Sequence, residues 1–401
     1  MYLIPLLTGC IPTDGSADAL EKARQEGYEQ ALEEFEGRLN AVKSDLEGQI
    51  ADVGAAAAAQ SDLGGRVTDL ETQMAVVQTD LPTLQNDVAA LQSSAVTMIE
   101  QNVTYSVSTP AAFMQTLADL DHYQIAKDAT VTIQLRDGTY YLTETVQIRH
   151  PDGDRIRIQG NAGDKSKVKL VYTGTAGSYA VQVVAGSRLA YLGDLSISCN
   201  TNGYGLQVDP NGSVNIGEMK IEGCERGISV VAGSLTAADG VATARWLEVV
   251  GCYDGVFGKA SSWLDLPYAE VSSSSHFGYV SDWGTIMRVS YSTAESNAAA
   301  GYYASNSTIF ADNTISVGNG AQGYIADYLS MIAAPISESS TNNVGYWSDR
   351  NSYIQATPTN AYSNIVDYAA YANSFIDVAD PTGTFSTASG FNDTTDWILT
   401  Y

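Results

Sequence analysis

The sequence is poor in positive charge. Its 401 residues include 20 lysines and arginines against 46 aspartates and glutamates, which gives a formal net charge of −26. After residue 260 the only basic residues are Arg288 and Arg350. Binding to nucleic acid or to an anionic membrane surface depends on basic side chains that neutralise phosphates. The composition therefore excludes both as partners recognised through charge.

Cysteine, histidine and long apolar runs are also scarce. The four cysteines and three histidines are scattered, without the spacing of a zinc site, so we predict no metal centre and no cofactor. Cys224 and Cys252 each lie three residues before a glycine of the repeat described below. We expect them to pack as small buried residues without redox chemistry. No apolar run reaches the roughly 20 residues that cross a bilayer.

The first ten residues offer a different route to a membrane. Leu7-Thr8-Gly9-Cys10 follows a short apolar run and resembles a bacterial lipobox, the signal whose cysteine is acylated. The apolar run is shorter than usual and no basic residue precedes it, so an accidental match is the alternative. Under the lipobox hypothesis Cys10 is the lipidation site of an outer-membrane lipoprotein. Residues 1–16 would then be a signal remnant and a tether.

Residues 17–100 carry the spacing of a coiled coil. Apolar residues alternate at intervals of four and three at Leu63, Val67, Leu70, Met74, Val77, Leu81, Leu84, Val88 and Leu91. The same spacing runs from Tyr28 to Leu46 and resumes one residue late at Ile50. Glycines and Pro82 predict two or three segments, with a kink or a new helix start at the proline. So narrow a stripe favours self-association over packing of a lone helix on a globular domain.

A glycine-tyrosine pair recurs at a fixed period in the distal region. The pairs Gly278-Tyr279, Gly301-Tyr302, Gly323-Tyr324 and Gly345-Tyr346 are 23, 22 and 22 residues apart. Within each unit a hydroxyl, a large apolar and a small residue alternate with the period of a β-strand, as in Ser307, Ile309 and Ala311. Asn297, Asn319, Asn342 and Asn364 form a further column, for which we expect a ladder of amide hydrogen bonds at a turn.

These signals predict an all-β fold: a right-handed parallel β-helix with an N-terminal α-helical coiled-coil stalk. The open end of such a solenoid must be covered. Ser108-Thr109-Pro110 precedes an apolar segment and predicts a capping helix. We therefore divide the chain into the segment 1–16, a stalk at 17–100, a capping helix within 105–125, the β-helix at 126–380 and a C-terminal cap or tail at 381–401.

The start of the β-helix resembles a known family. The capping helix is followed by DGTYY at 137–141 and by HPDGDRIRIQGN at 150–161. This order resembles the pectate-lyase-like β-helix domains of bacteriophage tail-spike and tail-fibre proteins, over about residues 105–378. The resemblance implies a homotrimer in which a coiled coil leads into three β-helices with a distal receptor-binding or glycan-cleaving surface. A lipobox does not fit a virion protein, and would instead imply a bacterial surface lipoprotein with a phage-fibre-like adhesin domain.

Glycan cleavage would require carboxylates gathered at one place. Asp327 and Asp349 each follow a repeat glycine by four residues. Stacked coils would bring them about 4.8 Å apart, close to the roughly 5–5.5 Å of a retaining glycosidase pair. Glu295 and Glu338 are further candidates. A uronate lyase is disfavoured, because the family implies an arginine base beside calcium and basic residues are nearly absent here. The alternative is a solvated column of turn aspartates that holds weakly bound cations.

Aromatic residues are the better candidates for recognition, because flat rings contact sugars at low entropic cost. The candidate ligand contacts are Tyr279, Tyr302, Tyr324, Tyr346, Trp283 and Trp347. An internal stack of the tyrosines is the alternative, because the phase of each strand decides where its rings point. The expected function is an extracellular fibre-like adhesin or receptor-binding protein that binds surface glycans. A tail-spike-like glycosidase is the alternative.

Overall fold

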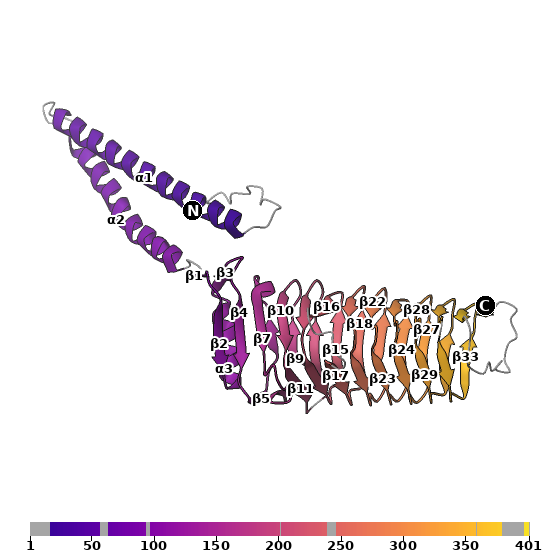
Figure 1. Cartoon of the computed structure of the whole chain (residues 1–401). Helices are drawn as coiled ribbons and strands as arrows, with labels where there is room; N and C mark the ends of the chain where they lie inside the picture. The colour runs from indigo at the N-terminus through magenta and orange to yellow at the C-terminus, as the bar shows by residue number, and fades with distance from the viewer. Residues whose placement is uncertain are drawn as a thin grey trace. The chain divides into compact units, whose positions relative to one another are not determined.

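The chain forms two units, Met1–Met98 and Ile99–Tyr401, the first helical and the second a β-solenoid (Figure 1). The computed structural model describes residues 17–56, 63–93, 97–200, 202–238, 246–357, 359–378 and 397–400. The lipidation site predicted at Cys10 lies outside the described residues, as does most of the C-terminal tail predicted at 381–401.

The first unit consists of two helices, α1 (Ala17–Ala56) and α2 (Leu63–Ser93). The predicted division into segments is seen, although α2 continues through Pro82 instead of starting anew there. In the single chain, seam positions are exposed, with 54% of Leu39 and 47% of Val77 accessible to solvent. The coiled coil and its strand number therefore stay predictions. In the described part of the chain, no helix combines the length and the apolar character that a membrane span requires.

The predicted capping helix is α3 (Pro110–Leu120). Thr109 precedes it in an extended conformation, and its hydroxyl oxygen accepts a hydrogen bond from the Ala112 amide at 3.1 Å. Pro110 occupies the first turn, where a backbone N–H would have no hydrogen-bond partner within the helix, so proline removes no helical hydrogen bond. Phe113 and Leu120 are buried in the core at the first coils. β1 (Thr97–Ile99) precedes this helix in the sequence and β3 (Tyr123–Ile125) follows it, and the two strands pair in a small sheet.

The described strands of the solenoid form three parallel sheets, and each coil adds one strand to each sheet in turn. Sheet I contains β2 (Val103–Val107), β4 (Val131–Leu135), β7 (Ile156–Gln159), β10 (Arg188–Gly193), β13 (Ser213–Ile216), β16 (Ser234–Ala237), β19 (Trp263–Asp265), β22 (Ile286–Arg288), β25 (Thr308–Phe310), β28 (Met331–Ala333), β31 (Tyr353–Gln355), β34 (Phe375–Val378) and β35 (Trp397–Thr400). Sheet II contains β5 (Gly138–Leu142), β8 (Val168–Tyr172), β11 (Leu195–Cys199), β14 (Met219–Glu222), β17 (Leu247–Val250), β20 (Glu270–Ser272), β23 (Thr293–Glu295), β26 (Ile315–Val317), β29 (Glu338–Ser340) and β32 (Asn360–Tyr362). Sheet III contains β6 (Val146–Ile148), β9 (Tyr179–Val183), β12 (Tyr204–Val208), β15 (Arg226–Val231), β18 (Asp254–Lys259), β21 (Tyr279–Asp282), β24 (Ala300–Ser305), β27 (Gln322–Asp327), β30 (Val344–Ser348) and β33 (Val366–Ala370). A short 3-10 turn, Gly153–Arg155, precedes β7. The predicted right-handed parallel β-helix is confirmed.

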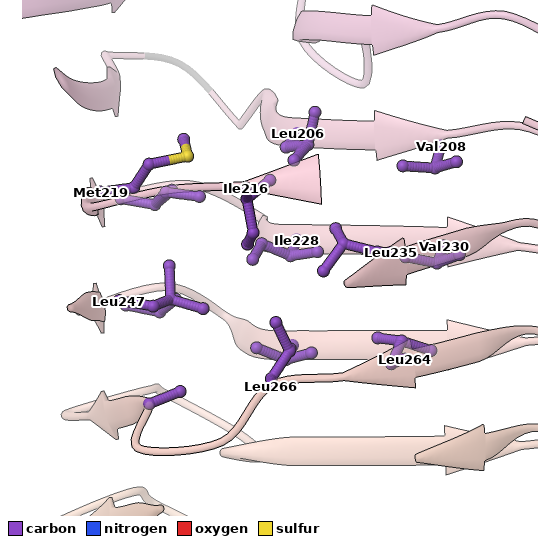
Figure 2. Packing of buried hydrophobic residues seen from close by; sticks show 14 of the residues in the cluster. Leu206, Val208, Ile216, Met219, Ile228, Val230, Leu235, Leu247, Leu264 and Leu266 are labelled. Atoms are coloured by element: carbon purple, nitrogen blue, oxygen red, sulfur yellow. The ribbon is translucent and has the colours of Figure 1, made fainter. Parts of the chain in front are cut away.

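The core runs along the inside of the three sheets. Side chains of one strand alternate between inside and outside, so an inward residue of one coil lies over the inward residue of the next. Leu206 of β12 pairs with Ile228 of β15, and both are fully buried (Figure 2). In the distal coils the predicted inward face is confirmed, because Ser307, Ile309 and Ala311 are all buried.

The asparagine ladder is present at the turn between sheets II and III. The Asn297 Nδ2 donates to Asn319 Oδ1 at 2.9 Å, and the Asn319 Nδ2 donates to Asn342 Oδ1 at 3.0 Å. The repeat glycine beside it allows a close approach, since a Cβ on Gly301 would lie 3.0 Å from the Asn319 amide nitrogen. The repeat glycines and the ladder asparagines thus pack against each other.

One expectation about the cysteines is corrected. Cys199 and Cys224 form a disulfide, with their Cα atoms 4.9 Å apart. The bond joins neighbouring coils, because β11 and β14 are adjacent strands of sheet II. Cys252 is buried with a free thiol, as expected for a packing residue, and burial raises its pKa to about 11.

Candidate functional site

The turns from sheet III to sheet I form a ridge of large exposed side chains along the distal coils. Tyr328 and Leu329 adopt φ angles of 50° and 59°, Arg350 adopts 53°, and Trp283 adopts 48°. Bulky residues rarely occupy this left-handed region, where glycine and asparagine fit with less strain. Strained backbone that persists with large side chains is typical of functional surfaces.

One turn of the ridge is a residue shorter than its neighbours. Residues 283–285 connect β21 to β22 and residues 328–330 connect β27 to β28, whereas only residues 306 and 307 connect β24 to β25. The strands on both sides of these turns are in register across the three coils. The difference therefore lies in the turn itself, and the turns on either side extend beyond the turn at Asn306.

The short turn forms the floor of a hollow of about 600 Å³, which we call the Asn306 hollow. Its lining consists of Trp283, Ser305, Asn306, Tyr328, Leu329, Arg350 and Asn351. The exposed fractions of Trp283, Tyr328 and Leu329 are 63%, 51% and 70%. Trp283 and Tyr328 belong to turns two coils apart, which is about 9.6 Å along the solenoid. That distance admits one ring with van der Waals contacts of about 3.5–4.0 Å on each side.

Arg350 connects this hollow to the predicted carboxylate pair. Its guanidinium carbon lies 3.9 Å from the centroid of the Tyr328 ring. The same group pairs with Asp327 at 3.5 Å and with Asp349 at 3.6 Å. Burial raises the pKa of the Asp327 carboxyl, and Asp349 adds to this effect while Arg350 opposes it. Both carboxylates contact the same guanidinium, so a single positive charge lies beside two acidic groups. Their role as a catalytic pair stays a prediction.

The other two carboxylate candidates do not join this site. Glu295 ends β23 and Glu338 begins β29, two strands further along sheet II. Their register positions differ, because Glu338 lies opposite Ile315 and Glu295 lies opposite Val317. Glu338 accepts a hydrogen bond from the hydroxyl of Tyr362. No acid-base pair is formed by these two residues.

The four tyrosines proposed as ligand contacts are inside the solenoid, which corrects that expectation. Tyr279, Tyr302, Tyr324 and Tyr346 are fully buried. Their rings stack coil on coil, with Tyr302 and Tyr324 parallel to within 5° at a centroid distance of 4.8 Å. Inward strand phase is the reason, since Tyr324 shares its face of the strand with the buried Ala326, whereas Ile325 between them is partly exposed. The alternative of an internal stack is the correct one.

The two tryptophans have different positions. Trp283 lines the Asn306 hollow. Trp347 is half-buried on sheet III, where it pairs in register with Ile325, and its ring lies 4.6 Å from that of Tyr371. It is therefore not part of the same surface.

Of the lining residues, sequence reasoning proposed only Trp283 and missed the other six: Ser305, Asn306, Tyr328, Leu329, Arg350 and Asn351. The usable signal was the change in repeat spacing from 23 to 22 residues at this coil, together with a basic residue in a region nearly without them. In the described ranges, no group of three or more histidine, cysteine, aspartate or glutamate side chains is arranged to hold a metal. Between Asp327 and Asp349, where a bound cation was considered, the structure has the guanidinium of Arg350.

No family model matches the chain, and no curated protein matches it in sequence. Solved structures that are similar to it include the Dettilon tailspike protein gp208, at 11% identity and a TM-score of 0.37, over 70% of this chain and 66% of that protein. Another is ORF18 of Geobacillus virus E2, at 10% identity and a TM-score of 0.29, over 76% of this chain and 63% of that protein. The matched region is thus slightly under two thirds of the length of either protein.

Proposed function

We propose that this chain is an extracellular, fibre-like receptor-binding protein that recognises a surface glycan in the Asn306 hollow. The observation that carries the proposal is the combination of Trp283, Tyr328 and Leu329, all more than half exposed, around one hollow of about 600 Å³. Exposed aromatic groups of this kind offer the apolar face of a sugar a large contact area at low entropic cost.

The polar lining supplies the groups that orient such a ligand. The amides of Asn306 and Asn351 and the hydroxyl of Ser305 line the hollow beside the aromatic side chains, and all three groups both donate and accept hydrogen bonds. A sugar hydroxyl also does both. The Arg350 guanidinium, paired with Asp327 and Asp349, adds an edge with hydrogen-bond donors and acceptors for sugar hydroxyls. An apolar surface with a few orienting polar groups is the usual composition of a small-ligand site.

Location and assembly follow as parts of the same proposal. The Cys199–Cys224 disulfide supports a place outside the cytoplasm, because such bonds persist in oxidising compartments. Exposed heptad positions of α1 and α2 support a homo-oligomer, for which the family resemblance implies three chains. Three copies would present three hollows and gain by avidity. Acylation at Cys10 would anchor this assembly to a membrane, whereas a virion or secreted fibre would lack that anchor.

The test is an array of purified bacterial capsular and O-antigen polysaccharides, followed by titration of the strongest binder. We expect Trp283→Ala to weaken that binding at least tenfold, as truncation of a central aromatic contact typically does. Trp263→Ala is the matched control. Trp263 is a tryptophan of β19 with 37% exposure that does not line the hollow, so binding should be unchanged.

Product analysis on the same polysaccharide separates binding from cleavage. Binding without release of oligosaccharides supports the proposal. Release that is abolished by Asp327→Asn or Asp349→Asn would show a glycosidase instead. Equal loss of binding in the Trp263→Ala and Trp283→Ala variants would remove the hollow as the site.

A further inference from the structure

A second irregularity interrupts the repeat, in the proximal coils on the outer face of sheet I. β10 pairs with β13 through Arg188 with Ser213 and Leu189 with Val214, and the register then shifts to Leu192 with Ile216. Two residues, Ala190 and Tyr191, therefore lie opposite the single residue Asn215. Such a β-bulge redirects side chains and occurs often beside binding sites. The next pair along the sheet, β13 with β16, has no shift.

The bulge borders a pocket of about 410 Å³. Arg157, Tyr191, Asn215 and Thr236 supply its polar side chains, from four consecutive strands of sheet I. This volume lies in the range of about 300–1,000 Å³ that is usual for small-ligand sites. Unlike the repeated surface of the distal coils, this set of residues occurs once.

Arg157 is the residue that gives the pocket its chemistry. Its guanidinium carbon lies 4.4 Å from the centroid of the Tyr191 ring. In the described part of the chain Arg157 makes no side-chain hydrogen bond and no ion pair, whereas Arg155 pairs with Asp152 and Arg226 pairs with Asp254. Stacking engages the face of a guanidinium, and its five donors lie in the plane of the group. Those donors are available to a ligand.

The groups around Arg157 are held in place by the protein. The Tyr191 hydroxyl donates to Asp194 Oδ2 at 2.9 Å, and burial raises the pKa of this tyrosine, so the hydroxyl stays protonated. Asn215 donates through Nδ2 to the Ala190 carbonyl of the bulge at 3.2 Å, and its Oδ1 accepts from the Thr236 hydroxyl at 2.6 Å. An amide carries two N–H donors, so Asn215 keeps one for a ligand beside Arg157.

We propose that this pocket binds the carboxylate of an acidic sugar. A planar carboxylate matches the fork of a guanidinium with two parallel hydrogen bonds, which are stronger than those of neutral pairs. The second N–H of Asn215 and the hydroxyl of Thr236 are placed for the hydroxyls of the sugar ring. The choice of a sugar as the carrier of the carboxylate rests on the proposed glycan-binding function, while the choice of a carboxylate rests on Arg157 alone.

The experiment is a calorimetric or saturation-transfer titration of the full-length chain with D-glucuronate. D-glucose, acetate and inorganic phosphate serve as comparison probes at constant ionic strength. We expect glucuronate to bind at least tenfold more tightly than glucose or acetate. Arg157→Gln should abolish this preference, and Arg157→Lys, which keeps the charge and loses the fork, should weaken it. Arg188→Gln is the matched control, because Arg188 is an exposed arginine of β10 outside the pocket.

Three results would overturn the proposal: equal binding of glucose and glucuronate, undiminished glucuronate binding in a folded Arg157→Gln variant, or acetate or phosphate bound as tightly as glucuronate. Thermal unfolding of each variant establishes that it is folded. If Arg157→Gln does not fold, the Arg157→Lys result decides, and wild-type affinity in that variant would refute the bidentate contact. Glucuronate binding that survives Trp283→Ala would separate this pocket from the Asn306 hollow, so failure at one site does not imply failure at the other.

Discussion

Tyrosine and asparagine side chains inside the core of the distal coils have hydrogen-bond partners on neighbouring turns and strands. The buried Tyr324 hydroxyl lies 2.9 Å from the hydroxyl of Thr314. Asn319 accepts from the backbone N–H and the side chain of Asn297 and donates to Asn342 and Ser316. A buried polar group without a partner costs about 1–3 kcal/mol, so each member of such a column depends on the next.

The ladder predicts a large loss of stability on substitution of Asn319. Asn319→Ala leaves two donors of Asn297 and one acceptor of Asn342 without this partner, and we expect a loss of roughly 2–4 kcal/mol in the free energy of unfolding. Asn343→Ala is the control, because Asn343 is exposed and makes a single bond to the Gly320 carbonyl. Urea unfolding measures both. A similar, small loss in the two variants would contradict a structural role for the ladder.

A pH dependence follows from the partly buried carboxyl of Asp327. Burial raises the pKa of this group in the folded chain, so folding favours its protonated form. The stability that this group contributes is complete below the ordinary aspartate pKa and is lost as the pH rises through the raised value. Asp327→Asn cannot ionise. The unfolding free energy of the variant relative to the wild type should therefore increase as the pH rises from below the ordinary aspartate pKa through the raised value, and a constant difference would contradict this assignment.

Among the structural elements, sequence periodicity predicted the strands correctly. It did not predict whether some side chains point into or out of the solenoid. Ser307, Ile309 and Ala311 alternate in the sequence and point inward in the structure. Tyr324 follows a repeat glycine, and from the sequence its ring fitted either face. A tyrosine is tolerated inside because a parallel stack and a hydroxyl partner satisfy it, which depends on contacts between coils. The same holds for the Cys199–Cys224 pair, whose closeness depends on the register of β11 with β14.

The turn and the bulge that border the two pockets were harder to predict than the strands. A one-residue deletion at Asn306 and a bulge at Ala190 are local departures from the repeat, and both coincide with a pocket. A search for a regular repeat does not reveal such local departures from it. In the sequence Arg350 was noted only as one of two basic residues of the distal region, although its position after Asp349 also brings it within reach of Asp327 on the preceding coil.

The helices allow a direct test of self-association. Val77 lies on the predicted heptad seam of α2 and Val76 lies beside it off the seam, with 47% and 54% of their surfaces exposed in the single chain. We expect sedimentation equilibrium to give the mass of three chains for the wild type and a lower mass for Val77→Asp, because a charge at the seam faces identical charges. Val76→Asp should retain the wild-type mass. A monomeric wild type would refute the stalk prediction.

At the scale of the whole molecule, the solenoid has two regions of different character. The proximal coils carry the disulfide, the bulge and ion pairs such as Lys169 with Glu222 at 2.6 Å. The distal coils carry repeated columns and almost no basic residues. Each proximal coil thus has features of its own, whereas the distal coils repeat the same residues in their interior. This division places a unique charged pocket and a mostly neutral aromatic hollow on the same shaft.

Because the distal coils repeat the same interior residues, one coil can be removed while its neighbours still match each other. Deletion of residues 301–322 would join Ala300 to Gly323, bring Tyr279 onto Tyr324 and restore the asparagine ladder between Asn297 and Asn342 with the native spacing. Stability in such arrays depends on contacts between neighbours, so we expect the shortened chain to unfold cooperatively with a melting temperature near that of the wild type. It would lack Ser305 and Asn306 and with them the Asn306 hollow. An insoluble or non-cooperative product would contradict this modularity. Growth or loss of whole coils would then let such a solenoid change its length, and gain or lose a surface pocket, without change to the packing of its core.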